Sequence, residues 1–133
     1  MLKVRTGLDG ATTRVGAPLR VGYLASSYYP DGSPAPWGHD SRVAVEMAVH
    51  ELNEAPCAGA APTIELHVVE TNGTVLPDLN QTLGAMLEAG ASTVLGADWS
   101  RVAVAASAFL ASRQVPLISA GATSAYLDAP LTG

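Results

Sequence analysis

The stretch STVLGADWSRVAVAASAFLASRQVPLISAGATSAYLD, residues 92–128, decides the fold. Residues 92–97 and 116–119 are short apolar runs, and the segment 99–114 between them has the apolar spacing of a helix. A strand, a helix and a second strand in this order predict a parallel βαβ unit. The second run then gives way to small residues and hydroxyls over 119–124. These residues fit either a plain turn, in which a hydroxyl caps the next helix, or a surface that contacts a ligand.

The same alternation continues toward the N-terminus. Residues 19–25 (LRVGYLA) and 63–71 (TIELHVVET) predict strands, and helices are expected over 40–55 and 77–90. The half-polar alternation of 63–71 places that strand at the outer side of the sheet. The complete order β-α-β-α-β-α-β predicts the α/β class, as a three-layer α-β-α fold around a parallel sheet.

Apolar residues at helical spacing mark the faces expected to pack on the sheet. They are Val45, Ala48, Val49 and Leu52 in the first helix, Leu79, Leu83, Met86 and Leu87 in the second, and Val102, Ala106, Phe109 and Leu110 in the third. In the last strand, Val115, Leu117 and Ile118 are expected to be buried. Asp40 is the expected N-cap of the first helix, after a loop over 26–39 rich in Pro, Gly and Ser.

Length and composition limit the classes of function. The chain has 133 residues, enough for one domain with a buried core, and a net charge of −5 with a single Lys. Nucleic-acid binding therefore lacks its basic footprint. Cys57 is the only cysteine, so neither an internal disulfide nor a zinc cluster of cysteines is expected. No apolar run reaches the ~18 residues of a membrane span.

The sequence also leads to a prediction about each end of the chain. Residues 1–18 contain no apolar signal-peptide core, and we expect a flexible leader there, followed by one lobe over 19–133. The pattern stops soon after the fourth strand, so the lobe looks truncated.

Motifs for catalysis and cofactor binding are missing from the pattern. Neither G-x-G-x-x-G nor G-x-x-x-x-G-K-[ST] occurs, and LISAG (117–121) has Leu117 where a nucleophile elbow needs Gly. His50 and Glu51 begin an H-E pair, but Glu54 stands where a zinc protease has its second His. We expect no enzyme, no cofactor and no metal.

A ligand site is expected where the strands end. Open parallel sheets bind ligands outside the carboxyl ends of their strands. The connections 26–39, 97–101 and 119–125 leave those ends. Asp98 is the acid at the strand ends with a clear claim to a site, and His39 lies in the first of these connections.

Four segments in register resemble a known family. They are AVEMAVHELNEAP, IELHVVETNGT, TVLGADWSRVAVA and VPLISAGATSAYLD. Together they resemble the receptor-family ligand-binding region, which has the type 1 periplasmic-binding-protein fold. That family includes amino-acid-binding transport proteins and the ectodomains of metabotropic glutamate, GABA-B and natriuretic-peptide receptors. The resemblance runs from about Leu19 to Asp128 and implies the first lobe of a venus-flytrap protein, whose second lobe is missing here.

The resemblance also implies roles for single residues. Ser100 matches the serine that holds a ligand carboxylate at a helix N-terminus, and Thr123 matches the threonine that receives the amino group. The carbonyl of Gly121 is a further acceptor, and Gly121, Ala122 and Trp99 are the next candidates for ligand contacts. From the residues themselves, a helix N-terminus and a hydroxyl oxygen suit these tasks. Aromatic residues of the first loop, Trp37 and Tyr28, are additional candidates.

The chain departs from the family pattern at several positions. Asp98 and Trp99 replace Gly and Ser, Gly121 replaces the Ser of glutamate-type members, and Gly73 replaces the usual Cys. Asp98 either caps the helix that follows or faces the cleft, where it would repel an anion and favour an amine. Trp99 either stacks on a ligand or packs under the first loop.

The sequence thus predicts non-catalytic recognition of a small, amino-acid-like molecule. The chain would be the first lobe of a domain on the extracellular side of a membrane, coupled to a downstream signalling part, with a homodimer as a further partner. One alternative is a soluble solute-binding protein of a transport system. An alternative of another class is a small flavodoxin-like enzyme.

Overall fold

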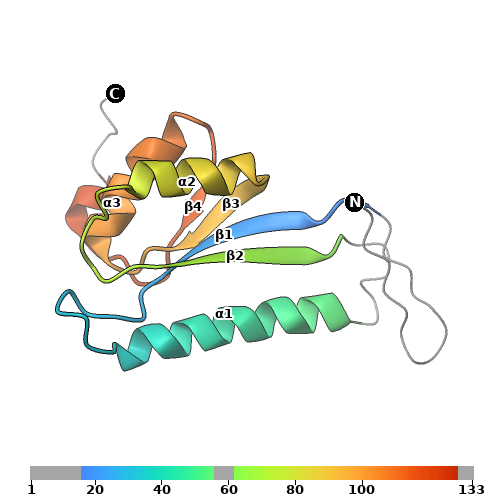
Figure 1. Ribbon diagram of the computed structural model, residues 1–133, viewed down its shortest axis with the longest axis horizontal. Helices are drawn as coiled ribbons and strands as arrows, with labels where there is room; N and C mark the ends of the chain where they lie inside the picture. Colours follow the sequence, from blue (N-terminus) through green and yellow to red (C-terminus); the bar gives the residue numbers. More distant parts are fainter. Residues whose placement is uncertain (1–15, 56–61, 129–133) are drawn as a thin grey trace.

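A computed structural model describes residues 16–55 and 62–128 of the chain, which form one parallel four-stranded sheet with helices on both faces (Figure 1). The predicted α/β class and the three-layer arrangement are confirmed. The strands across the sheet run in the order β2-β1-β3-β4, so β2 lies at an edge, as predicted. Their bounds are β1 Leu19–Ala25, β2 Ile64–Glu70, β3 Ala91–Gly96 and β4 Leu117–Ile118.

The helices divide unequally between the two faces. Helix α1 (Pro36–Glu54) lies alone on one face, and α2 (Leu79–Glu88) and α3 (Ser100–Ala111) lie on the other (Figure 1). A short 3₁₀ helix, Ala125–Asp128, follows β4. These bounds differ from the predicted ones by a few residues at most ends, as expected because helix ends fray and strand ends pair irregularly.

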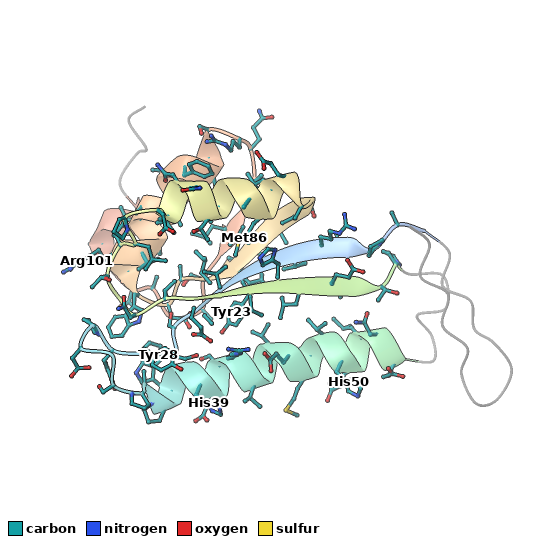
Figure 2. All side chains as sticks on the ribbon, viewed as in Figure 1. Tyr23, Tyr28, His39, His50, Met86 and Arg101 are labelled. Atoms are coloured by element: carbon teal, nitrogen blue, oxygen red, sulfur yellow. The ribbon has the colours of Figure 1, made fainter. Side chains whose placement is uncertain are left out.

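The main core lies between the sheet and the α2 and α3 helices. It contains Leu24, Leu79, Leu83, Met86, Ala91, Val94, Ala97, Val102, Ala103, Ala106 and Leu110. Met86 reaches the sheet over Gly22, where a Cβ atom would come within 2.8 Å of its sulfur (Figure 2). The predicted inner faces of α2 and α3 are therefore confirmed, with Leu87 and Phe109 partly buried at the margin.

The prediction that α1 begins at an Asp40 cap is wrong. The helix begins at Pro36, its N-cap is Ala35, and no side chain caps it. Proline suits a first turn because its ring fixes φ near the helical value and its missing N–H has no partner to lose there. The loop after β1 is accordingly shorter than predicted, and Trp37 and His39 belong to the helix.

The predicted inner face of α1 is half wrong. Val45 and Val49 are partly buried, whereas Ala48 and Leu52 are exposed, Leu52 by 55%. The helix packs mainly on β1 and β2, so only a narrow strip of its surface meets the sheet (Figure 1). The side of the helix nearer β3 and β4 is left without a packing partner in the described part of the chain.

The prediction that Ile118 is buried is also wrong, because its side chain is 59% exposed. Ile118 pairs with Leu95 in register, and both lie on the face of the sheet that carries α1. Among the described residues, no helix covers β4 on that face.

Two predictions concern residues that lie largely outside the described part of the chain. Most of the 1–18 leader and Cys57 lie outside the residues that the structure describes. The division of the chain at residue 18 stays a prediction.

Candidate functional site

Three connections meet at the carboxyl ends of the strands and surround a hollow of about 390 Å³, called here the cleft hollow. Its lining residues are Trp37 at the start of α1, Asp98, Trp99 and Ser100 at the start of α3, and Gly121 and Thr123 after β4. Six of the eight candidate residues named from the sequence therefore lie around one space. Tyr28 and Ala122 are not among the lining residues.

Ser100 joins the start of α3 to the connection after β4. Its Oγ accepts hydrogen bonds from the backbone N–H of Thr123 at 3.1 Å and of Ser124 at 3.2 Å. A serine hydroxyl can accept twice and donate once, so the hydroxyl proton is left for a further acceptor. The same side chain thus fixes the loop and offers one donor to the cleft hollow.

The small residues after β4 allow this loop to fold tightly against β3. The Ser119 hydroxyl donates to the Ala97 carbonyl at 3.3 Å and accepts the N–H of Ala122 at 3.1 Å. A Cβ atom at Gly121 would lie 2.7 Å from the Cβ of Asp98, so a larger residue would displace the loop. The Ser119 and Ser100 hydroxyls therefore hold the loop in place, and no α-helix follows the loop in the described chain.

Asp98 faces the hollow and does not cap α3. The N-cap of α3 is Trp99, and no side chain makes a capping hydrogen bond there. Burial raises the pKa of the Asp98 carboxyl above its usual value, and the hydrogen bond from the Gly121 N–H acts in the opposite direction. In the described part of the chain Asp98 has no salt-bridge partner. A half-buried carboxylate without a cation attracts a positively charged group.

Two aromatic rings, those of Trp37 and Trp99, line the hollow, and Tyr29 contacts both of them. Trp99 packs edge-to-face against Trp37, with ring centroids 5.3 Å apart, and against Tyr29 at 6.0 Å. The Trp37 indole N–H donates to the Tyr29 hydroxyl at 3.3 Å. The Trp99 ring also lies over Gly73, where a Cβ atom would approach it to 2.7 Å. Trp99 is thus both a packing residue under the first loop and a wall of the hollow.

Tyr29 is the residue that the sequence reasoning missed. Its neighbour Tyr28 was chosen instead, but Tyr28 is exposed and its backbone pairs with Pro34 (Figure 2). The side chains of adjacent loop residues point in different directions. The sequence alone does not show which of the two tyrosines contacts Trp99. His39 lies on the outer surface of α1, near the carboxylate of Asp40, and does not line the hollow (Figure 2).

The residues that line the cleft hollow provide hydrogen-bonding groups, one carboxylate and aromatic surface. Within residues 16–55 and 62–128, no group of three or more His, Cys, Asp or Glu side chains could hold a metal ion. No helix in these ranges is long and apolar enough to cross a membrane.

A comparison with known families identifies the family of the chain. The family model described as receptor family ligand binding region matches residues 40–130, more than half of the chain. The chain belongs to this family. The match contains all the lining residues of the cleft hollow except Trp37. Members of the family bind ligands, so a role in ligand recognition follows for this domain. No curated protein matches the chain.

Proposed function

We propose that the cleft hollow binds a small, amino-acid-like molecule and that the chain is the first lobe of an extracellular receptor domain. The observation that carries this proposal is the meeting of Asp98, Ser100 and Thr123 around one space of about 390 Å³. A hydroxyl donor, a helix N-terminus and an acceptor carboxylate within one hollow suit a zwitterion, because each of its charged groups finds an opposite partner.

The ligand carboxylate belongs at the start of α3. There the backbone N–H groups of the first turn have no helical partners, and the Ser100 hydroxyl proton is available. The ligand ammonium belongs at the Asp98 carboxylate, with the Thr123 hydroxyl as a second acceptor. The exposed face of Trp37 then offers cation–π attraction or apolar contact to the remainder of the ligand.

A second lobe supplies the other wall of the cleft in this proposal. The ligand would favour the closed arrangement of the two lobes by binding it more tightly than the open one, and this difference in affinity would be passed to a signalling part. A homodimer through the lobe is part of the same proposal. The support for each of these steps is family membership.

Two other functions lead to different expectations. A solute-binding protein of a transport system would use the same cleft, and the presence of a membrane span in the complete protein would separate it from a receptor. A flavodoxin-like enzyme would need reacting groups. In the described chain, Asp98 is the only carboxylate that lines the cleft hollow, and no histidine does.

Tryptophan fluorescence tests the proposal directly, because both tryptophans of the chain line the cleft hollow. A titration with α-amino acids is expected to change the emission, with a Kd on the order of 1 mM since one lobe offers one wall. Ser100→Ala and Asp98→Asn should each weaken binding by about tenfold or more. Ser112→Ala is the matched control, because Ser112 lies at the other end of α3. Unchanged emission with every amino acid, or equal losses in the control, would overturn the proposal.

Analogues of the ligand separate the two charged ends. Removing the ligand carboxylate as an amide should abolish the difference between wild type and Ser100→Ala. Acetylating the ligand amine should abolish the difference between wild type and Asp98→Asn. The opposite pairing would show that the ligand lies the other way round.

A further inference from the structure

The connection between β2 and α2 begins with a motif that the proposed ligand site does not use. Residues 72–74 are Asn-Gly-Thr, and residues 80–82, at the start of α2, are Asn-Gln-Thr. Both have the form Asn-x-Ser/Thr, which is the acceptor sequence for N-linked glycosylation. Such triplets also occur by chance, so the local structure decides which of the two can act as an acceptor.

In the first motif, the threonine is hydrogen-bonded to the asparagine. The Asn72 Oδ1 accepts hydrogen bonds from the Thr74 hydroxyl at 2.6 Å and from the Thr74 backbone N–H at 3.3 Å. A backbone N–H can only donate, so its partner must be the oxygen of the amide group. The orientation of the Asn72 amide is thereby fixed, and its nitrogen Nδ2 is turned away from the Thr74 N–H.

The nitrogen of the Asn72 amide is open to solvent. Within the described residues, the hydrogen bonds of this side chain are the two from Thr74 to its oxygen. Its nitrogen is not one of the buried polar atoms that lack a partner, and the residue as a whole is partly exposed. An oligosaccharide on Nδ2 would therefore break no hydrogen bond of the described fold and would extend into water.

The glycine between them places the motif close to the cleft hollow. Gly73 has a φ of +77°, which glycine adopts readily, and a Cβ atom there would come within 2.7 Å of the Trp99 ring. The turn is therefore packed against Trp99, which lines the cleft hollow, whereas Asn72 itself does not line it. A glycan on Asn72 would start beside the hollow without filling it.

The second motif lies in a helix and lacks this arrangement. Asn80 and Thr82 belong to the first turn of α2, where the Thr82 N–H donates to the Asp78 carbonyl at 2.9 Å. Side chains two positions apart on a helix do not face each other. Asn80 is exposed, but the Thr82 hydroxyl is turned away from its amide as long as the helix is formed.

We propose that Asn72 is a modification site that carries an N-linked oligosaccharide beside the cleft hollow. In the transfer, the Asn72 Nδ2 attacks the anomeric carbon of an oligosaccharide joined to a lipid diphosphate. The bond between Nδ2 and this carbon forms, and the bond from the carbon to the diphosphate oxygen breaks. The lipid diphosphate leaves with the electron pair, and one Nδ2 proton passes to a base of the transferase. The proposal rests on the extracellular placement proposed above, because this transfer takes place in the secretory pathway.

Translation of the full chain behind a signal sequence, in the presence of microsomal membranes, tests the acceptor. Only chains protected from added protease are scored, because these have entered the membranes. A glycosidase-sensitive increase in mass is expected, located at Asn72 by mass spectrometry of the peptides. Asn72→Gln and Thr74→Ala should abolish it, Thr74→Ser should keep it because the hydroxyl is retained, and Asn80→Gln is the matched control that should leave it unchanged. An unmodified Asn72 in the protected chains would overturn the proposal.

Mass spectrometry of the protein purified from its own cells tests whether the site is used. Most copies are expected to carry the oligosaccharide at Asn72. An unmodified Asn72 in every copy would overturn the proposal. An occupancy at Asn80 equal to that at Asn72 would overturn the argument that the helix disfavours the second motif.

The failure of this proposal and that of the cleft proposal give different results. Glycosylated Asn72 in a chain whose tryptophan emission responds to no amino acid would overturn the cleft proposal alone. Binding of an amino acid by a chain that is never modified at Asn72 would overturn the glycan alone. Where both hold, enzymatic removal of the oligosaccharide should leave the Kd of the amino acid within about twofold, because Asn72 does not line the cleft hollow. A larger change would overturn the position of the glycan outside the hollow.

Discussion

Glycine stands where the first turn of α1 approaches the backbone of Ser26, the residue that follows β1. A Cβ atom on Gly38 would lie 1.9 Å from the Ser26 carbonyl oxygen and 2.5 Å from its carbon. These are backbone atoms of a fully buried residue that directly follows β1, so they cannot rotate away as a flexible side chain could. Gly38→Ala is therefore expected to lower the free energy of unfolding by about 2–3 kcal/mol, measured by urea denaturation.

A matched substitution in another helix has the opposite expected sign. Gly84 lies in α2, and a Cβ atom there would meet only the end of the Phe109 ring at 3.9 Å, an ordinary contact. Gly84→Ala should raise the free energy of unfolding by up to about 1 kcal/mol, because alanine favours the helix. Equal effects of the two substitutions would show that the approach of α1 to Ser26 is not tight.

Tyr23 is expected to make stability depend on pH in the alkaline range. Burial, with the carboxylates of Asp98 and Glu70, raises the pKa of Tyr23 from 10.0 to about 12 in the folded chain. The unfolded chain loses this proton first, so the contribution is complete below pH 10 and is lost as the pH rises toward 12. It amounts to at most about 3 kcal/mol.

Tyr23→Phe provides the comparison for this pH dependence. The free energy of unfolding of wild type should fall relative to that of the variant as the pH passes from 10 to about 12, because only wild type has this ionisable hydroxyl. Urea denaturation at a series of pH values measures it. Parallel curves for the two proteins would mean that the Tyr23 hydroxyl ionises in the folded chain as readily as in the unfolded one.

At single residues, the sequence predicted which residues lie around the cleft hollow better than it predicted their contacts. The connections 97–101 and 119–125 could be chosen because they follow strand ends, where ligands bind in such sheets. Within them, Ser100 and Thr123 were chosen by the resemblance to the family. The two interpretations of Asp98 could not be separated, because a carboxylate before a helix suits both a cap and a cleft. The deciding contact is the Gly121 N–H on the Asp98 carboxylate, which joins residues 23 positions apart. Tyr29 was missed for the same reason, since its partner Trp99 is distant in sequence.

At the scale of elements, the helices on the two faces of the sheet differ in how far their methionines are buried. Met86 of α2 is 0% exposed in the core, and Met47 of α1 is 56% exposed. Met86→Ala should lower the free energy of unfolding by about 2–5 kcal/mol, because it leaves a cavity above Gly22. The same change at Met47 should have an effect within about 0.5 kcal/mol. A large loss at Met47 would show that the outer side of α1 is covered in solution.

The sequence also predicted the elements unequally. Helices α2 and α3 show a clear apolar stripe, and their packing agrees with it because the sheet and the neighbouring helix bury most of that stripe. Helix α1 has apolar residues on more than one side, so periodicity could not show which side meets the sheet. Ile118 was misjudged for a related reason. An apolar residue in a strand is buried only where another element covers it, and coverage is set by the topology of the whole sheet.

At the scale of the whole molecule, this unequal coverage divides the fold into a firm part and a looser part. Helix α3 places Val102, Ala103, Ala106 and Leu110 in the core, whereas Gly38 is the only buried residue of α1. The side of α1 toward β2 is held mainly by polar contacts, between Arg42 and Glu70 and between Asn53 and the backbone of Ile64. Such contacts exchange readily for water, so they contribute little net free energy.

Native-state hydrogen exchange should therefore find α1 less protected than α3. We expect amides in the middle of α1 to exchange through a local opening, with protection at least about tenfold below that of amides in the middle of α3. Denaturant should leave the α1 opening nearly unchanged and accelerate α3 exchange strongly, because only the global transition exposes the α2 and α3 core. Equal protection of both helices would show that α1 unfolds only with the whole chain. The unequal coverage of the two faces of the sheet would then not lower the local stability of α1.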